Sequence, residues 1–253
     1  MFSTFKLVFC YLTLGGLAGV IGIPYSFVVG NVRLLYRVVV KGIVRIGVRA
    51  AGIKVEVTGL ENVPAGVSCI FLSNHVSNLD PPVLLPEIPG QSSVLLKREL
   101  MRIPMLGTAM RMGKFVPVAR ENNRDAARAS VAAAAEALKS GLHILIFAEG
   151  TRSKDGRLAS FKRGPFYLAQ QTGAPIVPVA VSGTQTMMRK GSAAITPGVA
   201  KVAMLPAIYP KEFATREELM RAVRGAIAGA LPEEMRPVGQ GSGTRDQGQE
   251  ETI

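Results

Sequence analysis

Short apolar runs alternate with segments of helical spacing along most of the chain. Runs rich in β-branched residues predict buried strands, whereas apolar positions that recur with the period of a helix predict helices. The predicted strands cover residues 67–72, 93–97, 115–118, 144–147, 176–181 and 199–208, and the predicted helices cover 99–112, 124–140, 164–172 and 215–231, with a further helix beginning at 81. This alternation predicts an α/β fold in which helices flank a layered, largely parallel sheet.

The first 58 residues follow a different pattern, and we expect them to form a helical membrane anchor. Residues 7–32 carry no charge, and such a stretch is long enough to span a bilayer, although its glycines and Pro24 also allow a re-entrant hairpin. After it, a basic residue recurs at every fourth position, which places the cations on one face of a helix and apolar side chains on the other. These cations are Arg33, Arg37, Lys41, Arg45 and Arg49. A helix of this kind lies in the membrane interface, with its cations toward anionic head groups.

A cleaved signal peptide and a surface helix of a soluble domain are the alternatives for this region. Asp and Glu are absent from the first 55 residues, which argues against the surface helix, and the basic amphipathic segment directly after the apolar run argues against the signal peptide. We therefore expect the protein at the cell membrane, with the domain after the anchor on the cytoplasmic, positive side. The rest of the chain divides into an α/β domain over 59–235 and a polar tail over 236–253 that we expect to be disordered.

Composition narrows the choice of partners. The net charge of +12 favours nucleic acid, anionic lipid or an anionic substrate, and the mean hydropathy of +0.26 favours association with a membrane. Aromatic residues make up only 6%, and no zinc-finger or RNP-like pattern is present, so we expect no nucleic-acid partner. No cluster of Cys, His and Asp has the spacing of metal ligands, so we expect no metal. Cys10 and Cys69 are far apart and do not form a disulfide framework, which indicates a reducing compartment.

The strongest candidate for catalysis is the sequence S-N-H-V-S-N-L-D at residues 73–80. His75 follows a predicted strand, at the rim of the sheet where α/β proteins bind ligands. Asp80 precedes Pro81, which predicts a helix with Asp80 as its N-cap and proline at its first position. A carboxylate one short loop away can fix the tautomer of a histidine and stabilise the imidazolium. Taken alone, the pair also fits a capping aspartate beside a histidine without function.

The sequence F-A-E-G-T-R-S at residues 147–153 leaves a second buried strand at the same kind of position. Gly150 allows a tight turn in which backbone N–H groups and the guanidinium of Arg152 point at one anion. Glu149 can hold Arg152 in place or accept a hydrogen bond from a substrate hydroxyl. Lys162 precedes a predicted helix N-terminus, which also favours anions. A solvated loop with a Glu–Arg pair is the alternative.

Two further strands carry candidate residues. Arg120 follows the strand at 115–118, where it is either another anion ligand or an ordinary charge at a strand end. The apolar strand at 176–181 contains Val177, Pro178 and Val179, which either line an acyl groove or belong to the core.

The order of these motifs resembles that of the glycerolipid acyltransferase family. The motifs are N-H-x4-D, then G-K-F-x-P-V-x-R, then F-x-E-G-T-R-S, then V-P-V-A, and the resemblance extends from Val67 to Gly183. Within the family the chain looks most like the 1-acylglycerol-3-phosphate acyltransferases, which make phosphatidic acid. One departure is Ala119, where members often carry an acidic residue before the arginine.

The resemblance implies a catalytic dyad of His75 and Asp80. It also implies that the glycerophosphate is bound by the block that holds Arg120 and by the turn Glu149, Gly150, Thr151 and Arg152, to which we add Lys162. The acyl donor would be acyl-CoA or acyl carrier protein, used as a co-substrate without any cofactor, and the acceptor would be lysophosphatidate in the membrane leaflet. Neither cysteine lies in a motif that suggests a covalent acyl-enzyme.

Other functions compatible with the sequence are acylation of glycerol-3-phosphate or of another lysophospholipid, hydrolysis, and non-catalytic lipid binding. The arginines argue against a hydrolase, because activation of water needs no phosphate site. The intact His75 and Asp80 argue against a protein that only binds lipid.

Overall fold

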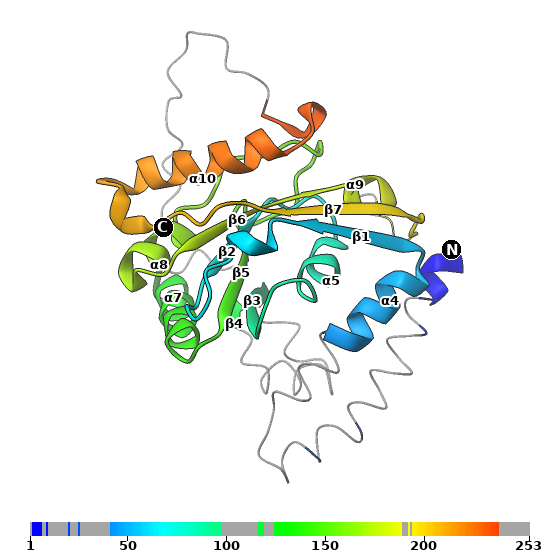
Figure 1. The fold of residues 1–253 in the computed structure, drawn as a ribbon, viewed down its shortest axis with the longest axis horizontal. Helices are drawn as coiled ribbons and strands as arrows, with labels where there is room; N and C mark the ends of the chain where they lie inside the picture. Colours follow the sequence, from blue (N-terminus) through cyan, green and yellow to red (C-terminus); the bar gives the residue numbers. More distant parts are fainter. Residues whose placement is uncertain are drawn as a thin grey trace.

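The computed structural model describes residues 2–6, 9, 20, 25, 41–97, 116–118, 124–188, 192 and 194–237 of the chain. Within these residues, seven strands form one sheet (Figure 1). The strands are β1 (Ile53–Thr58), β2 (Ile70–Ser73), β3 (Ser92–Lys97), β4 (Val116–Val118), β5 (His143–Phe147), β6 (Ile176–Ser182) and β7 (Gly198–Met204). The helices are α4 (Val44–Ala50), α5 (Asp80–Leu84), α7 (Arg124–Lys139), α8 (Gly164–Thr172), α9 (Thr184–Met187) and α10 (Arg216–Ala230), with short 3-10 turns η3 (Leu60–Asn62), η5 (Pro210–Glu212) and η6 (Glu233–Met235).

The sheet is mixed and has the strand order β1-β7-β6-β2-β5-β3-β4. Strands β6 and β7 are antiparallel, and every other neighbouring pair in this order is parallel, so β1 and β7 run opposite to the other five strands. The predicted α/β fold is therefore confirmed, with a sheet that is largely but not entirely parallel. The helical crossovers β2–α5–β3, β4–α7–β5 and β5–α8–β6 each join two parallel strands that have one other strand between them, and parallel strands need such long connections.

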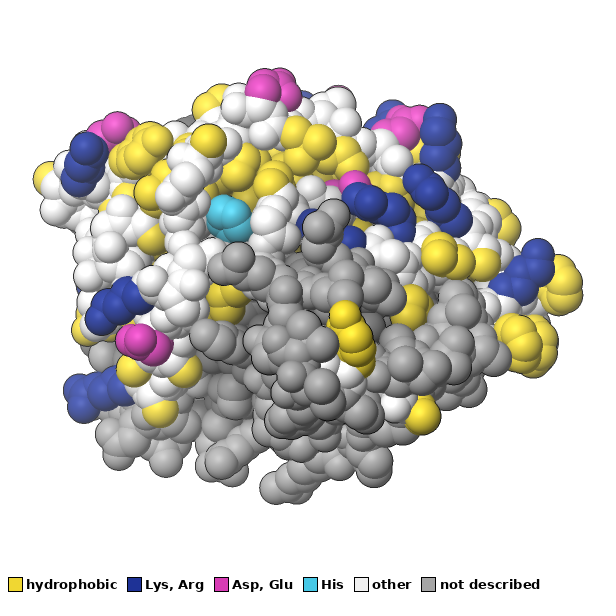
Figure 2. Space-filling view, turned by 60° about the horizontal axis from the view of Figure 1, so that its bottom comes forward, with side chains coloured by type: hydrophobic (Ala, Val, Ile, Leu, Met, Phe, Trp, Pro, Cys, Tyr) yellow, Lys and Arg dark blue, Asp and Glu magenta, His cyan; other side chains and the backbone are white. Residues whose placement is uncertain are grey.

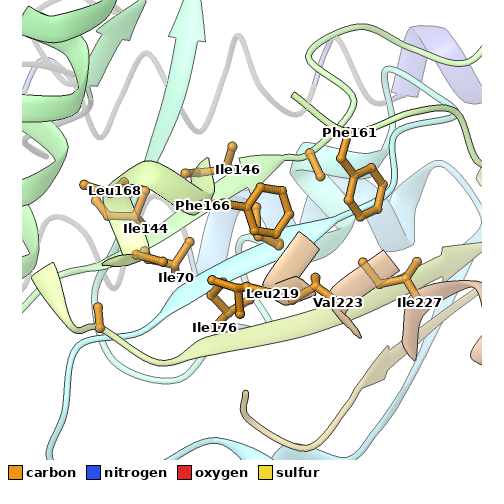
Figure 3. Packing of buried hydrophobic residues seen from close by; sticks show 14 of the residues in the cluster. Ile70, Ile144, Ile146, Phe161, Phe166, Leu168, Ile176, Leu219, Val223 and Ile227 are labelled. Carbon is orange, nitrogen blue, oxygen red and sulfur yellow. The ribbon is translucent and has the colours of Figure 1, made fainter. Parts of the chain in front are cut away.

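The central strands are apolar on both faces and separate two buried clusters. On one face, residues of β2, β5 and β6 such as Ile70, Ile144 and Ile176 pack under α7, α8 and α10. Figure 3 shows this packing, in which Phe166 lies beside Leu219. On the other face, alternate residues of the same strands, including Phe71, Leu145 and Val177, pack against α4, α5 and α9. Because both faces of these strands are covered, their sequences are continuous apolar runs.

Helix α10 begins as its sequence predicts. The Thr215 hydroxyl accepts a hydrogen bond from the backbone N–H of Glu218 at 3.2 Å, and the Glu218 carboxylate accepts one from the backbone N–H of Thr215 at 3.3 Å. This capping box satisfies N–H groups that have no partner within the helix. Leu219, Val223 and Ile227 then follow at intervals of four residues and form the buried stripe of the helix.

The structure corrects three details of the sequence prediction. Strand β1 was not predicted, and it places residues that we assigned to the anchor inside the sheet, beside β7. Helix α5 begins at Asp80 with Leu79 as its N-cap, so Asp80 is the first helical residue and not the cap. Strand β7 ends at Met204, and beyond it Ile208 forms only an isolated bridge with Ile176. The predicted helix at 99–112 lies outside the described residues.

The N-terminal basic segment contacts the domain itself. Lys41 Nζ donates to the carbonyl oxygens of Pro86 and Ile88, and the Arg45 guanidinium forms a bidentate ion pair with Glu87 at 2.9 Å. Burial and the neighbouring Arg45 lower the pKa of Lys41 to about 8. Two of the five cations that we expected to face lipid are therefore directed at the loop after α5.

The predicted membrane segment and the predicted tail lie largely outside the described residues. In the parts of the chain that the structure describes, no helix combines the length and the apolar character needed to cross a bilayer. Of the tail, Arg236 is described, and its guanidinium donates to the carbonyl oxygens of Leu231 and Gly229 at the end of α10.

Candidate active site

Three neighbouring parallel strands, β6, β2 and β5, end at the same edge of the sheet. Ser73 of β2 is in register with Phe147 of β5 and with Val179 of β6. The chain that leaves these strands carries His75 after β2, Glu149 after β5 and Thr184 after β6. Segments more than a hundred residues apart in the sequence are thereby brought together, at the edge where ligands bind in sheets of this kind.

His75 and Asp80 form the predicted pair. The Nδ1 atom of His75 lies 2.8 Å from Oδ2 of Asp80, whose side chain is fully buried, whereas the side chain of His75 is 16% exposed. The imidazole stacks on the ring of Phe147 with centroids 4.0 Å apart. Since Nδ1 is occupied by the carboxylate, Nε2 is the nitrogen available to exchange a proton with a substrate.

Four hydrogen bonds converge on the Asp80 carboxylate. Besides His75, the backbone N–H groups of Val76 and Ser77 donate to Oδ2 at 2.8 Å, and the Thr184 hydroxyl donates to Oδ1 at 2.6 Å. A buried carboxylate needs such partners because it has lost its hydration. Thr184 was not among the predicted site residues, although its place in S-G-T directly after a buried strand puts a hydroxyl at the same edge as His75.

Further hydrogen bonds fasten the loop that carries the dyad to the end of β6. The Asn74 side chain donates to Val181 O at 2.9 Å and accepts from Val181 N–H at 2.8 Å. The Ser77 hydroxyl donates to Met188 O at 3.1 Å, after α9. Asn74 therefore attaches the loop that carries His75 to β6, a role that the sequence did not predict.

Glu149 supports the backbone of His75. One carboxylate oxygen accepts the backbone N–H of His75 at 2.8 Å, and the other accepts that of Ala159 at 3.3 Å. Burial raises the pKa of Glu149, and these two hydrogen bonds oppose the shift. Its carboxylate faces the backbone, and among the described residues no ion pair joins it to Arg152. Of the two alternatives that we expected for Glu149, holding Arg152 is not among the contacts of the described residues, and binding of a substrate hydroxyl stays a prediction.

The turn after Glu149 lies next to the dyad. Gly150 has φ of 71°, and a Cβ placed on it would lie 3.2 Å from Cγ of Lys162, so the Lys162 side chain passes across this turn. The backbone N–H of Ser153 donates to His75 O at 2.8 Å, which ties the far end of the turn to the histidine. Thr151 is exposed and Arg152 is partly buried. Within the described ranges, the Arg152 guanidinium has no hydrogen-bond or ion-pair partner. Arg120 lies outside the described residues.

Comparison with known proteins identifies the family. Residues 54–182, about half of the chain, match the family model described as Acyltransferase. A protein of Pseudomonas aeruginosa named 1-acyl-sn-glycerol-3-phosphate acyltransferase is 35% identical over 211 residues, which cover 81% of this chain and 80% of that relative. The chain belongs to this acyltransferase family.

Two other similarities extend the comparison. A chloroplastic protein of Brassica napus named 1-acyl-sn-glycerol-3-phosphate acyltransferase BAT2 is 41% identical over 144 residues. That match covers 56% of this chain and 41% of the plant protein, so the chain spans less than half the length of that relative. The solved structure of PlsC, the 1-acyl-sn-glycerophosphate acyltransferase of Thermotoga maritima, matches with a TM-score of 0.74 and 30% identity, over 89% of this chain and 91% of that chain.

The proposed acyl-groove residues belong to the core of the acyltransferase. Val177 and Val179 are 0% and 1% exposed and pack in the cluster beneath α4 and α5, and Pro178 is buried as well. They lie in β6, between β2 and β7. The structure therefore supports the core alternative for these three residues.

The second histidine of the acyltransferase lies at the opposite end of β5. Nδ1 of His143 accepts the backbone N–H of Cys69 at 3.0 Å, and its ring packs edge-on against Phe71. Burial lowers the pKa of His143, and nearby Lys41 lowers it further. These contacts assign His143 a structural role. Over the described part of the chain, no group of three His, Cys, Asp or Glu residues is arranged to hold a metal ion.

Proposed function

We propose that the protein is a 1-acyl-sn-glycerol-3-phosphate acyltransferase, which moves a fatty acyl group from acyl-CoA or acyl carrier protein to the sn-2 hydroxyl of lysophosphatidate and so forms phosphatidic acid. The observation that carries this proposal is the buried Asp80 paired with His75, beside a turn that presents Arg152 and Lys162. Acylation of an anionic alcohol needs both parts: a base for the hydroxyl and cations for the phosphate. The names of the relatives favour lysophosphatidate over glycerol-3-phosphate.

The reaction begins with His75. Its Nε2 removes the proton of the sn-2 hydroxyl while Asp80 holds the ring through Nδ1 and stabilises the imidazolium. The hydroxyl oxygen attacks the thioester carbonyl carbon, the new ester C–O bond forms, and the C–S bond breaks. The imidazolium returns its proton to the departing thiolate, so protons and electrons balance without a cofactor or a metal.

The acyl group passes directly between substrates in this proposal. Cys69 is fully buried, and burial raises the pKa of its thiol to about 11. A protonated thiol without solvent access is a poor nucleophile. Cys69 is therefore unsuited to carry the acyl group, which supports transfer without a covalent acyl-enzyme.

Phosphate binding positions the reacting hydroxyl. We assign this task to Arg152, Lys162 and Arg120, together with the backbone N–H of Thr151. The N–H of Gly150 donates to Phe147 O at 3.0 Å, so Gly150 contributes the shape of the turn. Holding the phosphate fixes the distance between the hydroxyl and Nε2, and such positioning supplies much of the rate in two-substrate reactions. Glu149 contributes by holding the His75 backbone and does not contact the phosphate.

We propose that the reaction takes place at the membrane, on its cytoplasmic face. Residues 7–32 are uncharged, the chain carries a net charge of +12, and lysophosphatidate resides in the bilayer. The face drawn in Figure 2 places a band of hydrophobic side chains next to a group of Lys and Arg side chains. The acyl chain of lysophosphatidate is complementary to the hydrophobic side chains of this surface, and its phosphate is complementary to the Lys and Arg side chains.

The test offers lysophosphatidate and glycerol-3-phosphate separately to the detergent-solubilised protein, with acyl-CoA or acyl carrier protein as the donor. We expect phosphatidate from lysophosphatidate. Product from glycerol-3-phosphate alone would contradict the proposed acceptor, and free fatty acid as the sole product would show a hydrolase. The absence of product with both donors would contradict the proposal.

A further inference from the structure

Thr184 is a buried hydroxyl that no motif of the sequence analysis includes, and it contacts the proposed dyad. Its side chain is fully buried, and its Oγ1 atom lies 2.6 Å from Oδ1 of Asp80. That distance is typical of a charge-assisted O–H···O⁻ hydrogen bond. The other carboxylate oxygen, Oδ2, is the one that meets His75 Nδ1. Thr184 and His75 thus hold opposite ends of one carboxylate.

The hydrogen-bond donors to the Asp80 carboxylate come from two different segments of the chain. Those on Oδ2, from His75, Val76 and Ser77, all belong to the loop just before Asp80 and move with it. The donor on Oδ1 comes from the end of β6, 104 residues further along the chain. Among the contacts of the described residues, Thr184 is thus the one that links the carboxylate to the segment that follows β6. Without it, the described contacts hold the carboxylate through Oδ2 alone, by donors of its own loop.

The backbone around Thr184 is built to hold that hydroxyl in place. Gly183 has φ of 91°, and a Cβ on it would lie 2.3 Å from Val199 O, so the turn into α9 fits only glycine. On either side of this turn, Val181 is bonded to Asn74, and Met188 O accepts the Ser77 hydroxyl. The segment from Val181 to Met188 therefore forms a support for the whole loop that carries the dyad.

We propose that Thr184 is a positioning residue of the acyltransferase, which orients Asp80 and through it the imidazole of His75. This inference rests on the proposed function, since it gives Thr184 a role in the same proton transfer. Because Thr184 is fully buried and its hydroxyl donates to Asp80, we expect it to act on the chemical step and not on the binding of lysophosphatidate or the acyl donor.

The test compares Thr184→Val, Thr184→Ser and Thr186→Val with the wild-type protein and His75→Ala. Valine keeps the shape of threonine and removes the hydroxyl, whereas serine keeps the hydroxyl. Thr186 is a matched control, because it lies in the same helix and its exposed hydroxyl donates to Gly183 O at 2.8 Å instead of to Asp80. Steady-state kcat and KM for both substrates are measured, together with the melting temperature of each variant.

We expect Thr184→Val to lower kcat by about tenfold to a hundredfold, the effect of losing one hydrogen bond to a charged group, with KM changed by less than about threefold. Thr184→Ser restores most of kcat, and Thr186→Val behaves as wild type. The inference is overturned if Thr184→Val keeps the wild-type kcat, if its loss appears in KM, or if Thr184→Ser is equally impaired. If His75→Ala is fully active, the proposed function itself fails; an inactive His75→Ala beside a normal Thr184→Val rejects only the role of Thr184.

Discussion

The carboxylates of Asp80 and Glu149 are both buried beside His75, and each is held by backbone N–H groups. Asp80 accepts from Val76 and Ser77, and Glu149 accepts from His75 and Ala159. Leaving a buried charged acceptor without one of its donors costs about 1.5–3 kcal/mol, so each of these contacts resists movement of the loop. Asp80 consequently holds the imidazole ring of His75, and Glu149 holds the backbone of the same residue.

The contacts of Glu149 predict how its loss affects the reaction. In Glu149→Gln, one backbone N–H faces an amide NH₂ in place of an oxygen, so the His75 backbone shifts while the phosphate site stays intact. We expect kcat to fall by about tenfold or more, with KM for lysophosphatidate nearly unchanged. Steady-state kinetics over a range of lysophosphatidate concentrations checks this.

Arg152→Ala serves as the comparison for Glu149→Gln. Because Arg152 is assigned to the phosphate, its loss raises KM for lysophosphatidate, by a factor of about ten or more. A variant Glu149→Gln with raised KM and unchanged kcat would return Glu149 to the phosphate site and contradict the role that its backbone contacts indicate.

At the scale of single residues, the sequence predicts what is local. His75 and Asp80 are five positions apart, and the strand before them and the prolines after them fix their placement, so their pairing could be predicted. Thr184 is 104 residues from Asp80, and Glu149 is 74 residues from His75. Their roles depend on which strands are neighbours, and periodicity in the sequence does not determine strand order.

At the scale of elements, the turn between β6 and α9 places Thr184. Its Gly183 has a positive φ and approaches Val199 O of β7 so closely that no side chain fits. Gly141, in the turn before β5, has a similar φ of 86°, but a Cβ added there would meet nothing within 4 Å. A substitution at Gly141 therefore strains only the backbone, whereas one at Gly183 also produces a steric clash.

We expect Gly183→Ala to destabilise the protein by about 3 kcal/mol or more, because strain at a positive φ is joined by a clash with β7. Gly141→Ala carries only the cost of φ, about 1–2 kcal/mol. Thermal or denaturant unfolding of the two variants measures the difference. Equal destabilisation would show that Gly183 tolerates a side chain and that the turn is not fixed by its contact with β7.

Several elements follow directly from sequence patterns. Helix α8 occupies Gly164–Thr172 as predicted, ended by Gly173 in the left-handed conformation, and α10 begins at its capping box. Strand β1 was missed because its segment I-K-V-E-V-T follows the basic helix directly and was assigned with it to the anchor, although its alternation of apolar and polar residues is typical of a half-buried strand. The segment forms a strand because it pairs with β7, which lies far away in the sequence.

Over the molecule as a whole, the N-terminal cations that the structure describes, Lys41, Arg45 and Arg49, divide into two groups. Lys41 and Arg45 bind the loop after α5, whereas Arg49 lies exposed at the end of α4. A regular spacing of charges predicts a shared face of a helix, but it does not predict what that face meets. Of these three cations, only Arg49 is exposed in the way that the predicted basic surface requires.

This division predicts different effects for two matched substitutions. Arg49→Met removes a charge facing solvent and weakens binding to vesicles containing phosphatidylglycerol by about fivefold, or about 1 kcal/mol, without changing the melting temperature. Arg45→Met removes a charge already paired with Glu87, so it lowers stability by up to about 1 kcal/mol and leaves vesicle binding nearly unchanged. Vesicle sedimentation and thermal unfolding of both variants check this. Weaker vesicle binding by Arg45→Met than by Arg49→Met would contradict it.

The most direct test of the central claim is acyl transfer to lysophosphatidate by the wild-type protein, His75→Ala and His143→Asn. The asparagine variant is the matched control, because it alters the only other histidine while keeping a side-chain oxygen that can accept the N–H of Cys69. We predict phosphatidate from the wild type and from His143→Asn, and a rate at least about a hundredfold lower from a folded His75→Ala. Phosphatidate formed by His75→Ala at the wild-type rate would contradict the account.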